Sequence, residues 1–171
     1  MSLSALKYLK AFGRTILQGI VATDDLPPRV AGYITAATAS GDWRDAESLL
    51  WRAQATDPDC LHVYYTLYKF YFNHKRLGDA ERATCLALDA AARLANIAAD
   101  WRLQDISACD WGKAHSPQHF YLFSLKALAF IRLRQLRADD ADLILAKLRE
   151  IDPSDSVGHS VIESYAMGAA A

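Results

Sequence analysis

The sequence predicts an all-α fold, and three observations lead to this prediction. Apolar residues recur at i, i+3, i+4 and i+7 along most of the chain, which is the spacing of one face of an α-helix. No segment sustains the alternation of apolar and polar residues that is typical of a half-buried strand. Glycine and proline are few, with 8 and 5 among 171 residues. A chain of this length is expected to form one domain, residues 1–171.

Turn-forming residues divide the chain into eight expected helices. Ser4 can cap the first of them, and the proline pair in "TDDLPP" suits the first turn of the second. In "SGDW", Gly41 is expected to be the C-cap of the second helix and Asp42 the N-cap of the third. Pro58 ends the third, because proline disfavours helical backbone in the residue before it. The expected helices are residues 4–21, 27–39, 43–56, 61–73, 79–96, 118–136, 138–150 and 156–167.

Charge and cysteine content restrict the class of protein. The formal net charge is −1, so no overall field favours nucleic acid or a membrane surface. Three widely spaced cysteines without a CxxC pair favour a reducing compartment. Basic residues interrupt the apolar N-terminal segment, which argues against a signal peptide, and no apolar run reaches the length of a membrane span. We therefore expect a cytoplasmic protein that binds neither nucleic acid nor membranes.

Three segments share a regular spacing of alanine, and two of them also share a closing proline. In "GDWRDAESLLWRAQATDP" and "LRADDADLILAKLREIDP", an alanine precedes a proline at the same interval, from Ala46 to Pro58 and from Ala141 to Pro153. Between them, "LGDAERATCLALDAAA" places Ala80 one period after Ala46. The interval from Ala80 to Ala141 is longer, one such period plus the extra residues that precede the third unit. The chain therefore contains three copies of a helix–turn–helix unit, with extra residues before the third.

This pattern resembles the tetratricopeptide repeat family, which shares the period of about 34 residues. The family's small position at the start of the second helix matches Ala46, Ala80 and Ala141, and its bulky position matches Leu50 and Leu145. The middle unit departs from the pattern, with Thr84 at the bulky position and Ala92 at the proline position, and Ile34 and Tyr68 occupy slots where the family has a small residue. The resemblance implies a right-handed superhelix of antiparallel helix pairs, because one pair cannot bury its apolar face alone. It divides the chain into an N-terminal helix at 3–22, repeat 1 at 27–60, repeat 2 at 61–96, an insert at 97–118, repeat 3 at 119–153 and a capping helix at 154–171.

The aromatic stretch "LHVYYTLYKFYFNHKR", residues 61–76, gives its helix two faces. One face recurs at i, i+3, i+4 and i+7 and is expected to be core: Tyr64, Leu67, Tyr68 and Tyr71. In the resembled family, the other face and its equivalent in repeat 3 line a concave groove that binds peptides or partner helices. The expected groove residues are His62, Tyr65, Lys69, Phe72, Asn73, Phe123, Lys126, Phe130 and Arg134. Aromatic and arginine side chains are frequent hot spots, and the lysines favour an acidic partner.

The insert carries the chemically reactive residues of the chain. Cys109, His115 and His119 are the metal candidates, but Pro117 lies between the histidines and a fourth zinc-type ligand is missing. A nucleophilic Cys109–His115 pair, oriented by a nearby aspartate, is a catalytic alternative. No P-loop, GxGxxG, HExxH or GxSxG motif occurs. We therefore predict neither an enzyme nor a bound metal or cofactor, and we expect Trp101 and Trp111 to pin the insert onto the helices.

The sequence predicts a scaffold or adaptor that binds another protein or peptide through the groove. The size and the three repeats also resemble type III secretion translocator chaperones. "ADWR", "HFYLFSLKALAFIRLRQL" and "LREIDPSDSVGHSVIESY" resemble small repeat proteins encoded among bacterial nitrogen-fixation genes, which implies an accessory function there. Two alternatives stay open: a metal-binding or catalytic protein that uses the insert, and a homodimer paired through exposed apolar ends. The sequence does not say whether the N-terminal helix or the insert fills the groove.

Overall fold

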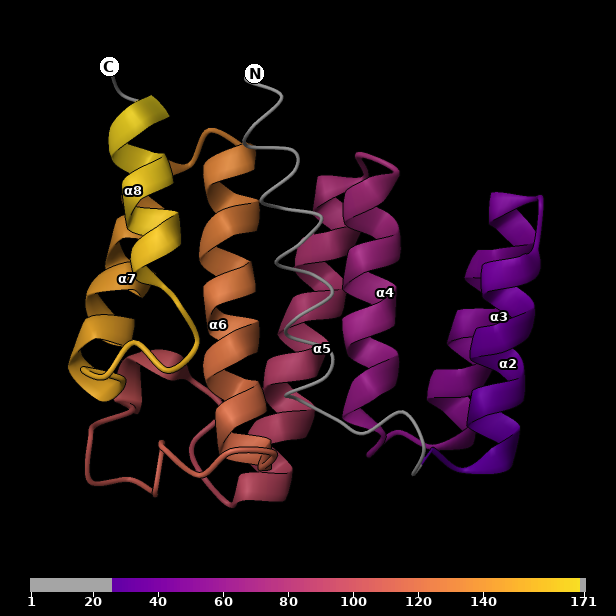
Figure 1. The fold of residues 1–171 in the computed structure, drawn as a ribbon, viewed down its shortest axis with the longest axis horizontal. Helices are drawn as coiled ribbons and strands as arrows, with labels where there is room; N and C mark the ends of the chain where they lie inside the picture. Colours follow the sequence, from indigo (N-terminus) through magenta and orange to yellow (C-terminus); the bar gives the residue numbers. More distant parts are fainter. Residues whose placement is uncertain (1–25, 170–171) are drawn as a thin grey trace.

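The computed structural model describes residues 26–169, and every regular element in this part is helical (Figure 1), which confirms the predicted all-α class. Expectations for residues 1–25, including the helix at 4–21, lie outside the described residues. No described helix is both long and apolar enough to cross a membrane. The elements are α2 (Pro28–Ala39), α3 (Trp43–Thr56), α4 (Leu61–Asn73), α5 (Leu77–Ala95), the 3-10 turn η2 (Trp101–Leu103), α6 (Pro117–Arg134), α7 (Ala138–Ile151) and α8 (Ser160–Ala169).

The helices stand side by side (Figure 1), and from α2 to α7 each packs against the next one in the chain. Helix α5 packs extensively against both α4 and α6, and α7 packs against α6. Further contacts join alternate helices, namely α2 with α4, α4 with α6 and α6 with α8. Helix α5 therefore lies behind α4 and α6, which share one side of the molecule with α8.

Local sequence explains where the helices begin. Pro28 occupies the first turn of α2, as predicted, and the Asp42 carboxylate caps α3 by accepting a hydrogen bond from Arg44 N at 2.9 Å. The C-cap of α2 is Ser40 in extended backbone, so the assignment of Gly41 as C-cap is wrong. Helix α5 begins at Leu77, two residues earlier than expected, with Arg76 as its N-cap.

Helix α8 begins four residues later than expected, because two carboxylates hold the preceding turn in another conformation. Asp152 accepts hydrogen bonds from Ser156 N at 3.0 Å and Val157 N at 3.2 Å. Asp155 accepts one from Ser160 N at 3.2 Å, which caps the new helix. These bonds use backbone N–H groups in a non-helical turn, so α8 starts only at Ser160.

The core consists of two clusters of buried side chains. The smaller joins α2 and α3 to α4, the start of α5 and one residue of α6. The larger joins α4, α5, α6, α7, the insert and the start of α8. The alanines at the repeat's small position are buried, with Ala46 5% and Ala80 and Ala141 0% exposed. Of the predicted core face of α4, Tyr64, Leu67 and Tyr71 are buried and Tyr68 is partly buried against both clusters: the first three are confirmed.

Hydrogen bonds tie α3 to α4. Trp51 Nε1 donates to the Tyr71 hydroxyl at 2.8 Å, and that hydroxyl donates to Glu47 Oε1 at 2.7 Å. Burial and the Glu47 carboxylate raise the pKa of Tyr71 to about 12. Arg76 continues the network with an ion pair to Glu47 at 3.0 Å. The first helix pair is therefore held to α4 by a chain of polar contacts as well as by apolar packing.

The insert folds against α6 and α7, and the prediction that two tryptophans pin it is confirmed. Trp101 is 8% and Trp111 5% exposed, and both belong to the larger core cluster. Trp111 Nε1 donates to Asp105 O at 3.0 Å within the insert, and the Tyr121 hydroxyl of α6 donates to Ala99 O at 3.2 Å. Lys147 of α7 donates to Gln104 O at 2.9 Å. These contacts place the insert at one end of the helices (Figure 1).

Candidate functional site

A row of aromatic rings crosses from α4 over α6 to α8. Two contacts join α4 to α6 near one end, since Tyr65 and Tyr68 have ring centroids 5.7 and 6.4 Å from that of Phe123. Further along, Phe72 lies 5.4 Å from Phe130, and Phe130 lies 5.5 Å from Tyr165 of α8. We call these six residues the aromatic row: Tyr65, Tyr68, Phe72, Phe123, Phe130 and Tyr165.

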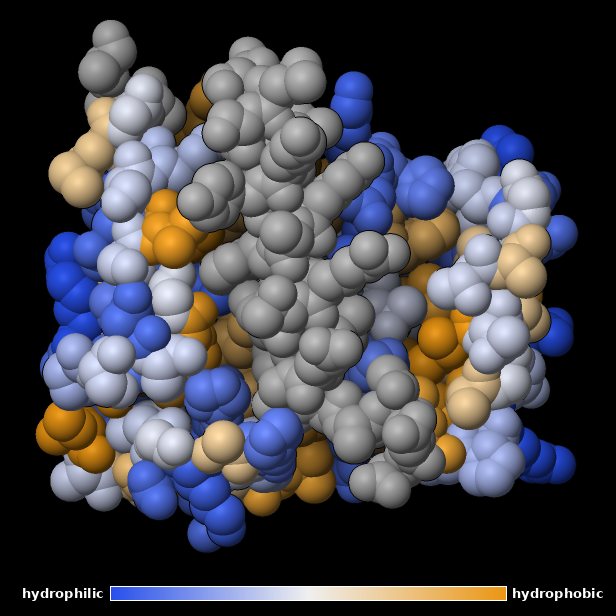
Figure 2. Space-filling view, viewed as in Figure 1, coloured by the Kyte–Doolittle hydropathy of each residue, from blue (hydrophilic) through white to orange (hydrophobic). Residues whose placement is uncertain are grey.

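Helical spacing within α4 and α6 explains the row. Phe72 follows Tyr65 by seven residues, or two turns, and Phe130 follows Phe123 by the same interval. Two neighbouring helices with rings at this interval can therefore match them pairwise along their length. Hydrophobic residues are visible on this side of the molecule between α2 and α4 and beside α8 (Figure 2). The contribution of Tyr165 was missed, because no periodic pattern linked α8 to the repeats.

The structure brings the predicted groove residues of α4 and α6 to one side but buries several of them. His62, Tyr65, Phe123 and Lys126 are between 2% and 7% exposed. Lys69, Phe72, Phe130 and Arg134 are half-buried, and Asn73 is exposed. Of the nine residues expected to line an accessible groove, five therefore keep exposed side-chain surface: Lys69, Phe72, Asn73, Phe130 and Arg134. The periodicity of the sequence predicted that these residues share a face. It could not predict how deeply each is buried, because that depends on the distance between α4 and α6.

The two lysines of the predicted groove differ in their surroundings. Lys69 Nζ lies 5.5 Å from the Tyr65 ring centroid, a cation–π contact on the half-buried part of the face. Lys126 Nζ lies 4.9 Å from the Phe123 ring and donates to Val157 O in the turn before α8. Burial lowers the pKa of Lys126 to about 7, against the opposing effect of the Asp155 and Asp152 charges. Lys126 therefore belongs to the interior, where it ties α6 to the turn that follows α7.

His62 is a buried histidine on the same face. It is 7% exposed, and its Nδ1 has no hydrogen-bond partner. Its ring lies 6.3 Å from that of Tyr65. Burial lowers the pKa of His62, because the charged imidazolium loses hydration. The folded chain therefore holds this ring in its neutral form at neutral pH.

The lowered pKa of His62 predicts a loss of stability on acidification. Between its folded and unfolded pKa values the unfolded chain binds more protons, so the free energy of unfolding falls as the pH drops below about 6.5. Replacing His62 with glutamine should remove part of this dependence, at most about 1.4 kcal/mol per pH unit. Denaturant unfolding at a series of pH values measures it. The exposed His74 is the matched control, and equal curves for H62Q and H74Q would contradict the prediction.

The predicted metal candidates of the insert do not come together. Among residues 26–169, one group of histidine, cysteine and acidic residues has its ligand atoms close together, and it contains none of Cys109, His115 and His119. His115 is exposed with a positive φ of 56°, whereas His119 is partly buried near the start of α6. No hydrogen bond joins Cys109 to His115 among the described residues. Burial and the neighbouring Asp110 charge raise the pKa of Cys109, which disfavours the nucleophilic thiolate.

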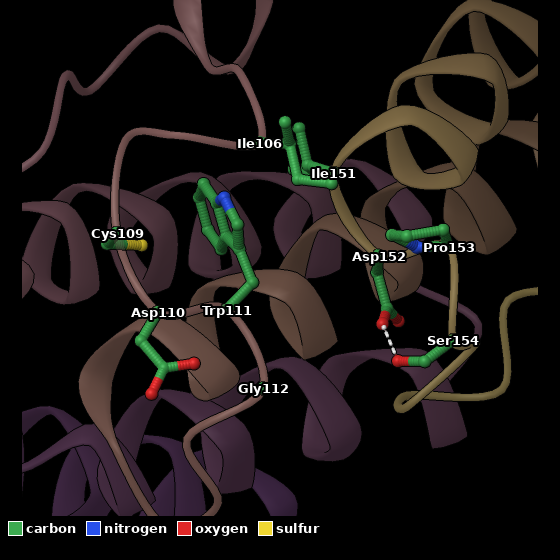
Figure 3. Close-up of a pocket in the computed structure, with 9 residues that line it drawn as sticks. All are labelled: Ile106, Cys109, Asp110, Trp111, Gly112, Ile151, Asp152, Pro153 and Ser154. Atoms are coloured by element: carbon green, nitrogen blue, oxygen red, sulfur yellow. Dashed lines mark hydrogen bonds between the residues drawn. The ribbon is translucent and has the colours of Figure 1, made fainter.

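A shallow cavity of about 240 Å³ lies between the insert and the end of α7. Figure 3 shows that Cys109, Asp110 and Trp111 approach it from the insert, and that Asp152 and Ser154 face it from the other side. The Asp152 carboxylate accepts a hydrogen bond from Ser154 Oγ at 3.1 Å and two more from backbone N–H groups. These hydrogen bonds order the turn after α7, and none of the described residues that line the cavity is a histidine.

Comparisons of the chain with protein-family models, curated proteins and solved structures find no match.

Proposed function

We propose that the chain is a tetratricopeptide-like adaptor that binds an apolar, acidic segment of another protein along the aromatic row. Two features support the repeat assignment. From α2 to α7 each helix packs against the next, and α2, α4, α6 and α8 contact one another in turn, which is the contact pattern of stacked helix pairs. The three alanines at the small position are buried where helices approach closely, as the repeat pattern requires.

The observation that carries the proposal is the half-buried end of the row, where Phe130 lies against both Phe72 and Tyr165. Aromatic side chains at this degree of exposure can anchor a partner, because they bury a large area at small cost in side-chain entropy. Lys69 and Arg134 follow the same helix faces and supply positive charge beside the rings. A segment with apolar anchors and aspartate or glutamate matches both properties.

A random peptide library displayed against the purified chain tests this proposal. We expect enrichment of peptides that combine aromatic or aliphatic residues with acidic ones. F72A and F130A should each weaken a selected peptide at least about tenfold, since truncation of a hot spot costs about 2 kcal/mol or more. K69E should weaken it through charge reversal, with a dependence on salt concentration.

Matched controls lie on another face of the chain. L86A and R82E alter an apolar and a basic residue of α5 that are exposed away from the row, and both should bind the selected peptide like the wild type. Circular dichroism and thermal unfolding should confirm that every variant is folded. Enrichment of basic peptides, or equal loss in the row and control variants, would contradict the assignment of the row as the binding surface.

A further inference from the structure

The turn between α7 and α8 gathers two carboxylates and an imidazole. Asp152, Asp155 and His159 each offer one ligand atom, and these atoms all lie within 4.8 Å of one another. Within residues 26–169 this is the one such group. Asp152 is 2% and His159 5% exposed, whereas Asp155 reaches the surface. The group is therefore enclosed by the protein on one side and open to solvent through Asp155.

The carboxylates keep the capacity to bind another group. Asp152 Oδ1 accepts two hydrogen bonds, from Ser154 Oγ and Ser156 N, but Oδ2 accepts only one, from Val157 N. Asp155 accepts one hydrogen bond at each oxygen, both from Ser160. A carboxylate offers about four lone-pair positions, so each residue retains at least one. The hydrogen bonds fix the orientation of both carboxylates and leave these positions available.

The ring of His159 has an unsatisfied nitrogen. Nε2 lies 3.2 Å from the Asp152 carbonyl oxygen and 3.4 Å from Asp155 Oδ1. A carbonyl oxygen only accepts hydrogen bonds, so Nε2 of the neutral ring carries the proton in this contact. The lone pair of Nδ1 then faces Glu163 Oε1 at 3.5 Å, and Nδ1 has no hydrogen-bond partner. Two acceptors therefore face each other at a buried position, which is unfavourable.

We propose that this turn binds a divalent transition-metal ion such as Zn²⁺ through His159 Nε2 and the carboxylates of Asp152 and Asp155. An ion on Nε2 takes the place of the proton there, and the proton moves to Nδ1. The Nδ1–H group can then donate to Glu163, which turns the unfavourable contact into a hydrogen bond. A carboxylate on the second nitrogen is the usual partner of a metal-bound histidine.

Distance and charge agree with this choice of ion. Tetrahedral zinc with ligands at about 2.0–2.2 Å separates neighbouring ligand atoms by roughly 3.4 Å, and the distance between His159 Nε2 and Asp155 Oδ1 is 3.4 Å. Mixed imidazole and carboxylate ligands suit zinc better than Mg²⁺ or Ca²⁺, which prefer oxygen ligands alone. Two cations lie nearby, with Arg149 paired to Glu163 at 3.3 Å and Lys126 bonded to Val157 O. The three carboxylates outnumber them, so an added cation is favoured. The site does not depend on partner binding at the aromatic row.

Equilibrium binding to the metal-stripped full chain tests the proposal, with Zn²⁺ compared with Mg²⁺ and Ca²⁺. We expect one equivalent of Zn²⁺ to bind in preference to the other two ions. His159→Gln and Asp155→Asn should each weaken Zn²⁺ binding at least about tenfold, and Glu163→Gln by about 10–100-fold. Glutamine and asparagine keep hydrogen-bonding atoms in place, which limits damage to the turn.

Cys109→Ser and His115→Gln in the insert are the controls and should leave Zn²⁺ affinity unchanged. Loss of binding in these controls, or unchanged affinity in H159Q, would overturn the proposal.

A measurement on the unsubstituted chain removes any dependence on folding of the variants. Long-range ¹H–¹⁵N spectra distinguish the two neutral forms of a histidine ring from its protonated form. We expect His159 to carry its proton on Nε2 without metal and on Nδ1 after one equivalent of Zn²⁺. Spectra that do not change with Zn²⁺, whether the ring is neutral or protonated on both nitrogens, would overturn the assignment of His159 as a ligand.

Discussion

Replacing Leu67 with alanine is expected to lower the free energy of unfolding by about 3–4 kcal/mol. Leu67 is 0% exposed and lies in the smaller core cluster, where α4 meets α2, α3 and α5. Truncation removes buried apolar area and leaves a cavity that the surrounding helices can only partly fill. Chemical denaturation followed by circular dichroism measures the loss. A loss of about 3–4 kcal/mol would be a large fraction of the free energy of unfolding of a domain of this size.

The matched control is Leu143→Ala on α7, where the leucine is 59% exposed. Its substitution should cost less than about 1 kcal/mol, because little apolar surface is withdrawn from the core. Equal losses for L67A and L143A would show that α4 does not pack as described. An unchanged slope of free energy against denaturant concentration would confirm that L67A alters stability rather than the extent of unfolding.

Replacing Trp111 with alanine is expected to cost about 3–5 kcal/mol and to release the insert from the helices. Trp111 is 5% exposed, its ring lies 6.0 Å from that of Tyr121, and its Nε1 donates to Asp105 O. Hydrogen exchange should show faster exchange between residues 97 and 116 than elsewhere in the chain. Denaturant unfolding gives the accompanying change in free energy.

Trp111→Phe separates packing from hydrogen bonding. Phenylalanine keeps a ring against Tyr121 but cannot donate to Asp105 O, so the cost should fall to about 1–2 kcal/mol. Uniformly faster exchange throughout W111A would mean that the insert and the helices unfold as one unit. Unchanged exchange in the insert would contradict its attachment through Trp111.

Helix positions could be predicted where local signals mark both ends. The bounds of α3 were predicted at both ends, because Asp42 caps its start and Pro58 follows its end. The start of α8 could not be predicted, because it depends on hydrogen bonds from the Asp152 and Asp155 carboxylates. The polar turn before α8 suggested a break, but not that these side chains would keep the next residues out of the helix.

In the candidate sites too, local spacing could be predicted from the sequence but contacts between distant residues could not. Helical spacing predicted that Phe72 and Phe130 share a face with their neighbours, and the structure pairs these two rings. The spacing did not predict that Tyr65 and Phe123 would be buried, because burial depends on the separation of α4 and α6. His159 was missed altogether, since it follows the repeats in a stretch without helical period. The interval Asp-x-x-Asp-x-x-x-His in a short turn was the available signal.

The insert has a consequence for the order of folding. Helices α2 to α5 are joined by short connections, whereas the whole of segment 96–116 separates α5 from α6, the pair with extensive mutual packing. Closing this longer connection costs about 1–1.5 kcal/mol more than closing a four-residue turn, by the logarithmic dependence on loop length. Contacts between residues near in sequence form faster than distant ones. The first four described helices should therefore associate early, and docking of α6 onto α5 should set the rate at which the native chain appears.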